Sequence, residues 1–413
     1  MSAEQVKPGY KRTEVGVIPI DWEITTIDKA TAPDGLVRGP FGGALTKGIF
    51  EKTGKKVYEQ RNAINRNEAI GEYFISEKKF GELKRFSVVS GDFIVSCSGT
   101  IGKIFQIPNG APEGVINQAL LKLRINSTKL DSKFFLYYFD WDKFQKLIID
   151  NTHGGAMPNL VGMSQFRLMK IPRPPLQEQC SIASALSDVD ALLAKLDQLI
   201  AKKRDLKQAT MQQLLTGQTR LPGFSGKWEL KRLGDICNLE MGRTPSRINQ
   251  SYWGQGYKWL SIADLKTKII RESSEEVTEL AAKEMRIVPK GTLLMSFKLS
   301  IGRLAFAGCD LFTNEAICSF NNLQANANYL YYALGRVDFS LYGKQAVKGY
   351  TLNKASLKTV ELSLPPTDEQ TAIATALSDL DAELAALEHR RNKTLEVKQG
   401  MMQELLTGRI RLI

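Results

Sequence analysis

Several features that carry chemistry are scarce or missing in this chain of 413 residues. It has only two histidines and five cysteines. The cysteines are scattered along the chain, and even the closest pair, Cys309 and Cys318, lacks the spacing of a zinc site or a disulfide framework. We therefore expect no metal site, no histidine-based acid–base site, and a reducing compartment such as the cytoplasm.

Apolar segments of membrane-spanning length are also missing. No run of about 18 apolar residues occurs, which excludes a transmembrane helix. The first residues, 1–22, lack the apolar core of a signal peptide. We expect a soluble cytoplasmic protein.

The nucleotide-binding and methyltransferase motifs that would indicate an enzyme are missing too. There is no G-x-x-x-x-G-K-[ST] loop for ATP, because Gly99–Lys103 has neither its spacing nor its final Ser or Thr. No Asn/Asp-Pro-Pro-aromatic motif is present for adenine methylation. We therefore predict no catalytic residues in this chain.

Basic residues, in contrast, are abundant. Lysine and arginine number 56 against 44 acidic residues, which gives a net charge of +12 and a pI of about 9.3. This balance favours an anionic partner, of which nucleic acid is the commonest. The length allows two or three domains, each with its own core.

A long internal repeat organises the chain. Residues 174–221 and 365–412 align without a gap, and more than half of the paired residues are identical. Each copy follows a Pro-Pro pair and ends in Leu-Leu-Thr-Gly, so Gly217 and Gly408 can adopt the left-handed helix cap. We predict a helix over Gln177–Leu215 and its counterpart in the second copy.

Apolar residues follow a four–three spacing in both copies, which is typical of helices that pair along their length. In the first copy they are Ile182, Leu186, Val189, Leu193, Leu196 and Ile200. In the second copy they are Ile373, Leu377, Leu380, Leu384 and Leu387.

The segments before the two helices are distant copies of each other. Residues 98–103 match 298–303, and Ile116–Ala119 matches Thr313–Ala316. In the first copy we predict a strand over Leu120–Ile125 and one helix over Ser132–Ile149. The stretches 38–43 and 242–247 differ between the copies, as expected of one scaffold with two sets of recognition loops.

These motifs resemble the specificity (S) subunit of type I restriction-modification enzymes. The resemblance covers essentially the whole chain. The matching segments are residues 9–22, the Gly-Pro-Phe-Gly turn at Gly39–Gly42, its alternative form at Gly242–Ser246, the Ser-Gly-Thr-Ile-Gly-Lys segment, the helix starts and the Leu-Leu-Thr-Gly ends. One departure is Lys298-Leu299-Ser300, which replaces Ser98-Gly99-Thr100 and predicts a differently shaped loop.

The resemblance implies an α+β fold in which two similar target-recognition domains are joined by two long antiparallel coiled-coil helices, with a pseudo-twofold internal repeat. The expected parts are a first recognition domain (1–173, with the N-terminal segment), a central conserved helix (174–217), a second recognition domain (218–364) and a distal conserved helix (365–413).

The implied function is that of a non-catalytic subunit that binds a bipartite double-stranded DNA target. One recognition domain would bind each half-site, and the helices would set the spacer and dock partners. Those partners are two methyltransferase subunits and two restriction/translocase subunits. S-adenosylmethionine, ATP and magnesium are expected in the partners, and no cofactor in this chain.

Two alternatives stay open on the sequence. One is a stand-alone DNA methyltransferase or nuclease with an unrecognised active site. The other is a transcriptional regulator, although no compact helix-turn-helix pattern is present.

Candidate DNA contacts are polar loop residues, because Arg, Asn and Gln can bond two atoms of one base edge and Lys holds phosphate. For Phe41 and Trp253, packing within the loop is favoured over base stacking, and Lys103 and Arg303 are interpreted as phosphate anchors or scaffold. The first domain contributes Arg38, Gly39, Phe41, Lys47, Tyr58, Gln60, Arg61, Asn62, Ser98, Thr100 and Lys103. The second contributes Arg243, Thr244, Ser246, Arg247, Tyr252, Trp253, Lys258, Lys298, Ser300 and Arg303.

Overall fold

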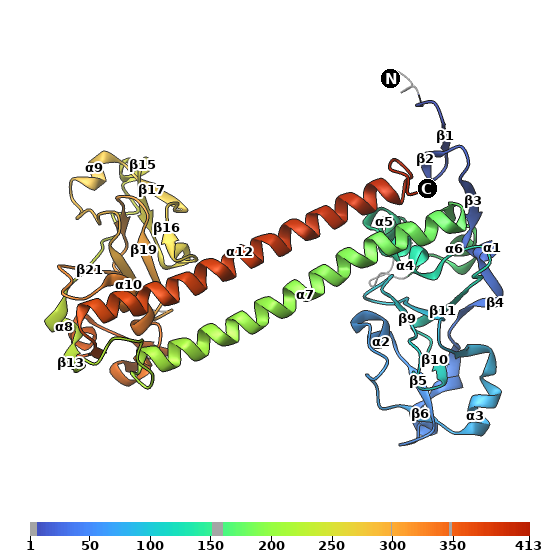
Figure 1. Ribbon diagram of the computed structural model, residues 1–413, viewed down its shortest axis with the longest axis horizontal. Helices are drawn as coiled ribbons and strands as arrows, with labels where there is room; N and C mark the ends of the chain where they lie inside the picture. Colours follow the sequence, from blue (N-terminus) through green and yellow to red (C-terminus); the bar gives the residue numbers. More distant parts are fainter. Residues whose placement is uncertain (1–5, 151–159, 299, 347–348) are drawn as a thin grey trace. The chain divides into compact units, whose positions relative to one another are not determined.

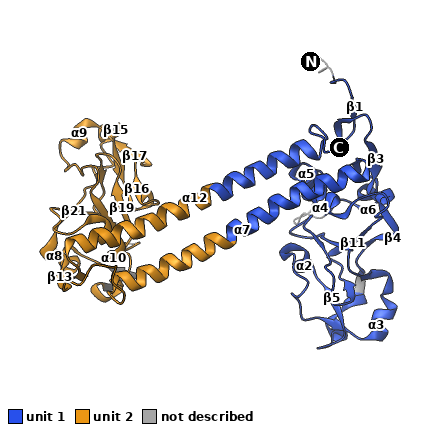
Figure 2. Cartoon of the chain, viewed as in Figure 1, with its two compact units in different colours: residues 1–197, 390–413 blue, residues 198–389 orange. Residues whose placement is uncertain are grey.

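The computed structural model describes residues 6–150, 160–298, 300–346 and 349–413. The chain divides into two compact units, shown in different colours in Figure 2. Unit 1 comprises residues 1–197 and 390–413, and unit 2 comprises residues 198–389. Each unit therefore contains one globular part and a piece of each of two long helices.

The two long helices confirm the predicted repeat. They are α7 (Leu176–Leu215) and α12 (Thr367–Leu405), drawn in green and red in Figure 1. The predicted start of α7 was wrong by one residue, whereas its end was predicted correctly. Gly217 and Gly408 both have a φ of +70°. Because glycine has no Cβ, it adopts this left-handed conformation without strain and ends each helix where the sequence indicated.

Ion pairs show that the helices run antiparallel within each unit. As the residue number rises along α7, that of the partner on α12 falls. The pairs are Asp190–Lys398 and Asp197–Arg391 in unit 1, and Arg204–Glu388 and Lys207–Asp381 in unit 2. Along α7, five of the six predicted seam residues are buried, and Val189 is half-buried. On α12, Ile373 and Leu377 are buried and the later seam residues are half-buried.

Unit 1 contains two four-stranded sheets, with strand orders β4-β11-β8-β9 and β6-β5-β10-β7. The first sheet is antiparallel throughout, whereas β5 and β10 of the second are parallel. The strands of the first sheet are β4 (Thr31–Arg38), β8 (Phe93–Ser96), β9 (Ile104–Gln106) and β11 (Leu120–Ile125). Those of the second are β5 (Lys55–Tyr58), β6 (Phe74–Ile75), β7 (Ser87–Val88) and β10 (Gly114–Ile116).

Unit 2 repeats this plan with a five-stranded sheet, β14-β21-β18-β19-β16, and a three-stranded sheet, β17-β15-β20. In the smaller sheet, the parallel pair of β15 and β20 corresponds to β5 and β10. The larger sheet differs from its counterpart in unit 1, because its edge strand β16 pairs parallel to β19. The larger sheet consists of β14 (Asn238–Met241), β16 (Ile269–Ile270), β18 (Leu293–Ser296), β19 (Leu304–Ala307) and β21 (Ile317–Asn321). The smaller consists of β15 (Trp253–Leu260), β17 (Glu275–Val277) and β20 (Phe312–Thr313).

Helices next to the long pair complete each core. The predicted strand over Leu120–Ile125 is β11, but the single helix predicted over Ser132–Ile149 was wrong. The chain forms α4 (Ser132–Asp140) and α5 (Asp142–Asp150), because Trp141 takes an extended conformation with a ψ of 130° and breaks the helix. In unit 2 the counterpart of α4 is α10 (Ala327–Leu334). Buried aromatic residues of α4 and α10 lie in the main core of their unit.

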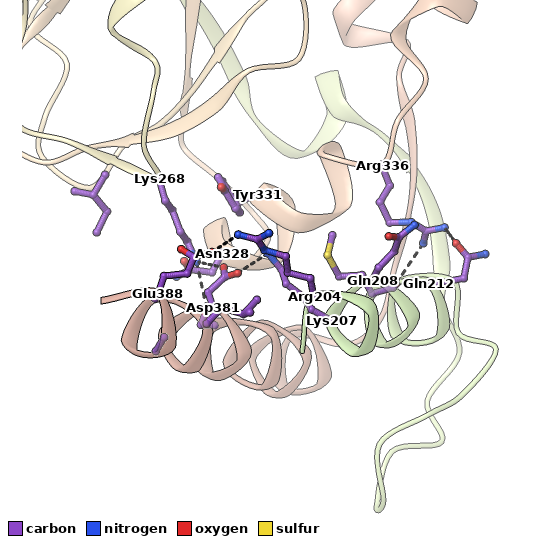
Figure 3. Close-up of a pocket in the computed structure, with 16 residues that line it drawn as sticks. Arg204, Lys207, Gln208, Gln212, Lys268, Asn328, Tyr331, Arg336, Asp381 and Glu388 are labelled. Atoms are coloured by element: carbon purple, nitrogen blue, oxygen red, sulfur yellow. Dashed lines mark hydrogen bonds and ion pairs between the residues drawn. The ribbon is translucent and has the colours of Figure 1, made fainter. Parts of the chain in front are cut away.

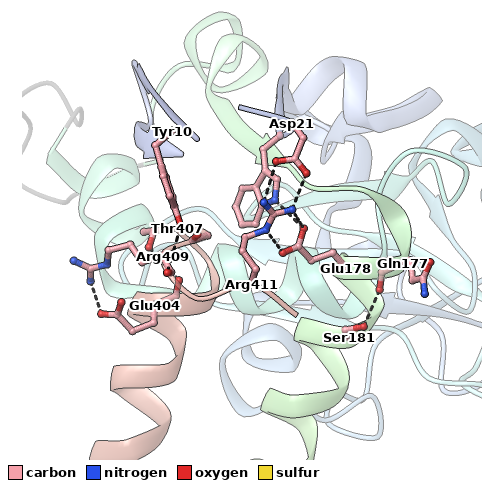
Figure 4. Close-up of polar contacts among 11 residues, drawn as sticks. Tyr10, Asp21, Gln177, Glu178, Ser181, Glu404, Thr407, Arg409 and Arg411 are labelled. Carbon is pink, nitrogen blue, oxygen red and sulfur yellow. Dashed lines mark hydrogen bonds and ion pairs between the residues drawn. The ribbon is translucent and has the colours of Figure 1, made fainter. Parts of the chain in front are cut away.

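A polar clasp in unit 1 joins the start of α7 to the tail after α12 (Figure 4). The Glu178 side chain is only 3% exposed. It accepts hydrogen bonds from Trp22 Nε1 at 2.9 Å and from Arg411 Nε at 2.6 Å. Arg411 also donates to both carboxylate oxygens of Asp21, at 3.0 and 2.7 Å. These carboxylates raise the pKa of Arg411, with Glu178 the larger cause, and Arg411 lowers the pKa of Asp21.

Unit 2 forms the same clasp with the matching residues of the repeat. The Glu369 side chain is 0% exposed and accepts from both Arg220 and Trp228, the latter at 3.2 Å. The internal repeat therefore extends from the backbone to buried side-chain contacts. One partner is missing from unit 2, since no carboxylate matching Asp21 pairs with Arg220 among the residues described there.

Candidate nucleic-acid interface

In unit 1, the predicted loop residues meet at one end of the antiparallel sheet. The strand register pairs Arg38 with Leu121, Leu120 with Ser96, and Val95 with Ile104. The loops that leave these strand ends contain most of the first set of candidates, from Arg38 to Phe41 and from Ser98 to Lys103. Strand pairing thus brings together residues that are distant in the sequence.

The corresponding end of the larger sheet in unit 2 has the same register. Met241 pairs with Cys318, Ser296 with Ile317, and Met295 with Leu304. The loops at this end carry Arg243, Thr244, Lys298, Ser300 and Arg303. We call these two regions the sheet-end surfaces of units 1 and 2.

A glycine fixes the first loop of each sheet-end surface. The peptide N–H of Gly39 donates to the Leu120 carbonyl at 2.9 Å, and that of Gly242 donates to the Ile317 carbonyl at 3.3 Å. A Cβ on Gly39 would lie 1.8 Å from the Asn117 carbonyl oxygen, and one on Gly242 would lie 2.0 Å from that of Thr313. Because these distances leave no room for a side chain, Gly39 has a scaffold role.

The second loop is anchored by a serine in both units. The Oγ of Ser96 accepts from the Lys103 N–H at 3.0 Å, and the Oγ of Ser296 accepts from the Arg303 N–H at the same distance. The base of this loop is therefore the same in both units, despite the Lys298-Leu299-Ser300 departure. Leu299 itself lies outside the described residues. Lys103 and Arg303 both project from this base and are exposed.

Two candidates of unit 1 are buried, in contrast to the surface position that the sequence predicted. Tyr58 is fully buried and donates to the Pro112 carbonyl at 2.6 Å, and burial raises its pKa to about 12. Asn62 is also fully buried. Its side chain accepts from the Glu59 N–H at 2.8 Å and donates to the Ile70 carbonyl at 2.6 Å. Both residues support the fold, because their polar atoms are already used inside it.

The remaining candidates of unit 1 are at least partly accessible. Arg61 is exposed and pairs with Glu59 at 2.7 Å. Gln60 starts α2 (Gln60–Asn65), and its buried Oε1 has no hydrogen-bond partner within the described part of the chain. Phe41 is 74% exposed, so the packing expected of it within its loop is wrong. Arg38 lies beside it, with its guanidinium 6.0 Å from the ring centre. The other accessible candidates are Lys47, Ser98, Thr100 and Lys103.

Trp253 in unit 2 does pack within its loop, as expected. Its ring meets Trp259 edge-on at 4.9 Å, and its Nε1 donates to the Ser246 carbonyl at 3.1 Å. The guanidinium of Arg247 lies 3.8 Å from the Trp253 ring centre.

Carboxylates neutralise several candidates of unit 2. Arg247 pairs with Glu275, and Lys258 pairs with Glu276 at 2.7 Å and Glu272 at 2.9 Å. Glu276 is the main cause of a raised Lys258 pKa. Glu284 accepts from Tyr252 at 2.7 Å, and its carboxylate lies 3.9 Å from Arg243. These cations are therefore less available for DNA phosphate than their number indicates.

Unit 2 also contains a cavity that the sequence did not indicate (Figure 3). It measures about 990 Å³ and lies against α7, α12 and α10. Its charged lining residues are mostly basic: Arg204, Lys207, Lys268 and Arg336 lie beside Asp381 and Glu388. Lys268 donates to Tyr332 Oη at 2.8 Å. Burial is the main cause of a lowered Lys268 pKa.

The described residues lack two further features, a metal site and a membrane-spanning helix. Within residues 6–150, 160–298, 300–346 and 349–413, no group of three or more His, Cys, Asp or Glu side chains is arranged to hold a metal ion. No helix in the same ranges is long and apolar enough to cross a membrane.

Comparison with known proteins decides the family. The model of the type I restriction modification DNA specificity domain matches the chain twice, at residues 41–203 and 225–397. The chain belongs to this family. It is therefore a specificity subunit and not a methyltransferase or nuclease, as the sequence motifs predicted.

Some relatives of the specificity subunit match nearly its whole length and others match part of it. The putative type I restriction enzyme MjaX specificity subunit of Methanocaldococcus jannaschii is 25% identical over 98% of this chain and 97% of its own length. The MjaIX specificity subunit of the same organism is 35% identical over 41% of each chain. The crystal structure of an S subunit from M. genitalium has a TM-score of 0.56 at 17% identity, covering 94% of this chain and 96% of that one. A structure of a type I R-M system, from a study of its assembly and conformational transition, has a TM-score of 0.57 at 17% identity, covering 95% and 99%.

Each copy of the specificity domain adds one surface residue that the sequence prediction missed. Gln118 and Glu315 are exposed on the turn that enters β11 and β21, next to the glycine-fixed loop. The sequence held a signal for them, because Ile116–Ala119 and Thr313–Ala316 match as turns and differ at this polar position. The match itself indicates scaffold, and the difference within it marks an exposed position that varies between the copies.

Proposed function

We propose that this specificity subunit binds a bipartite double-stranded DNA target, with one half-site recognised by the sheet-end surface of each unit. The observation that carries the proposal is the shared framework of the two surfaces. The same glycine and serine contacts fix the loops, and the exposed side chains differ between the units. Different side chains on one framework suit the recognition of two different base sequences.

Membership of the family supports a proposal for the wider assembly. We propose that the chain carries two methyltransferase subunits and two restriction/translocase subunits, and that α7 and α12 dock partners and set the spacer between half-sites. S-adenosylmethionine, ATP and magnesium would then bind the partners and not this chain. The proposed division is a recognition domain at 1–173, a helix at 174–217, a second recognition domain at 218–364 and a helix at 365–413. All five cysteines are free, which fits a cytoplasmic location.

Exchange of one recognition domain tests this function. Trp228–Leu364 would be replaced by the same domain of a relative, and the chain would be produced with its methyltransferase subunits. Sequencing of methylated DNA should show a new half-site on one side and the original half-site on the other.

Two outcomes would contradict the proposal. If both half-sites changed together, the units would not recognise DNA independently. If the purified chain alone bound S-adenosylmethionine or ATP and modified or cleaved DNA, it would be an enzyme in its own right.

A further inference from the structure

Gln118 and Glu315 occupy one structural position in two copies. Each follows an asparagine whose side chain holds the turn. Asn117 Oδ1 accepts from the Ala119 N–H at 3.0 Å, and Asn314 Oδ1 accepts from the Ala316 N–H at 3.1 Å.

The backbone of this turn is also held from behind in both units. The N–H of Asn117 donates to the Tyr58 carbonyl, and that of Asn314 donates to the Leu260 carbonyl, both at 2.9 Å. A residue between such fixed points is presented to solvent at a defined place. A fixed position is what recognition of a single base requires, because a side chain on a mobile loop would meet several bases.

The surroundings of the position place it among groups suited to DNA. In unit 1, Arg38 Nε donates to the Gln118 carbonyl at 3.4 Å, and exposed Lys103 lies on a neighbouring loop of the same surface. In unit 2, Thr244 Oγ1 donates to the Glu315 carboxylate. That hydrogen bond is the main cause of a lowered Glu315 pKa, and Lys298 lowers it further. Glu315 therefore presents a charged acceptor at neutral pH.

The two side chains differ in a way that matches base chemistry. A glutamine amide carries both a donor and an acceptor, the pattern that pairs with N7 and the N6 amino group of adenine. An ionised glutamate only accepts, which suits the N4 amino group of cytosine. The spare oxygen of Glu315 is oriented by Thr244, so its acceptor geometry is set before DNA binds.

We propose that Gln118 and Glu315 are the same specificity-determining position in the two copies, with Gln118 recognising an adenine in one half-site and Glu315 a cytosine in the other. This inference rests on the proposed function, since it assumes that both sheet-end surfaces contact base edges.

Reciprocal substitution tests it. Gln118→Glu and Glu315→Gln would each be made in the full chain with its methyltransferase subunits, and methylated DNA would be sequenced. The first variant should change one adenine to cytosine in the half-site of unit 1, and the second should change one cytosine to adenine in the half-site of unit 2. Binding to duplexes with each base at that position should show a change in preference of about 5- to 100-fold.

Gln165→Glu is the matched control, because it makes the same charge change at an exposed residue of unit 1, on α6 (Met163–Leu168). It should leave the methylated sequence unchanged. A variant that folds but methylates poorly is judged by the duplex binding series. Weakening that is equal for all bases, or an unchanged preference, would overturn the proposed base contacts. Domain exchange distinguishes this outcome from failure of the proposed function. If only the proposed base contacts are wrong, exchange of a recognition domain would still alter one half-site.

Discussion

The two units share the contacts that hold their surfaces in place and differ in what those surfaces expose. The glycine-fixed loop, the serine-anchored loop and the asparagine turn are the same in both. In unit 1, Arg38, Lys47 and Lys103 have no salt-bridge partner among the described residues, whereas Arg243, Arg247 and Lys258 in unit 2 face carboxylates. Interior contacts are constrained by packing, and exposed charges vary at little cost in stability.

The same comparison applies to the buried clasps. Glu178 and Glu369 occupy equivalent places, but Arg411 in unit 1 has Asp21 as a second carboxylate partner. Arg220 in unit 2 has the Gly226 carbonyl instead, at 2.9 Å. The clasp of unit 2 therefore depends more strongly on its one glutamate.

The largest expected effect comes from removing that glutamate. Glu369→Ala leaves Arg220 without a carboxylate and Trp228 Nε1 without its acceptor. We expect the free energy of unfolding of unit 2 to fall by about 3 kcal/mol. This value is at the low end for a broken buried ion pair, because the Arg220 side chain is 27% exposed. Glu178→Ala should cost about 1 kcal/mol less, because Asp21 still pairs with Arg411.

Hydrogen–deuterium exchange by peptide measures this difference, because it reports the opening of each unit separately. Faster exchange should appear in the unit that carries the substitution. Glu383→Ala serves as control, since it removes an exposed partner of Lys203 and should cost less than about 1 kcal/mol. Equal losses from the two clasp variants would show that Asp21 adds nothing.

A smaller effect is expected from crowding the glycine-fixed loop. In Gly39→Ala the new methyl group would collide with the Asn117 carbonyl, so the loop must shift at a cost of about 1–3 kcal/mol. Recognition of the unit 1 half-site should weaken, and the unit 2 half-site should be unaffected. Gly48→Ala is the control, because nothing lies within 4 Å of its added Cβ. Duplexes altered in one half-site at a time measure the outcome, and equal weakening at both half-sites would contradict it.

Sequence alone predicted the repeated parts well and the individual contacts poorly. The helix ends follow from local rules, since Pro-Pro starts and Gly217 and Gly408 end each long helix. The break at Trp141 could not be predicted, because an apolar pattern continued across it and tertiary packing decided the conformation. Tyr58 and Asn62 have residue types suited to DNA, yet Tyr58 is bonded to the distant Pro112 carbonyl and Asn62 to the carbonyl of Ile70 in the following loop. The candidate cations were found by type, but their carboxylate partners depend on the fold: the pairing of β15 with β17, for example, places Glu276 opposite Lys258.

The smallest expected effect concerns the exposed cations of the two surfaces and the salt dependence of DNA binding. A lysine that contacts phosphate releases a counterion on binding, so its loss lowers the salt slope of the binding constant by about 0.9. Lys103→Ala and Arg303→Ala should each reduce the slope by about this amount, with equal weakening for all sequences. Lys258→Ala should change the slope by much less, because Glu272 and Glu276 already neutralise that lysine.

The measurement is the dissociation constant for one target duplex over a range of salt concentrations, with Lys78→Ala on α3 (Glu77–Glu82) as a control for net charge. If Lys258→Ala lowered the slope as much as Lys103→Ala, ion pairing within the protein would not distinguish the two surfaces. The two units would then be distinguished by the base edges that they contact and not by the charge that their surfaces present.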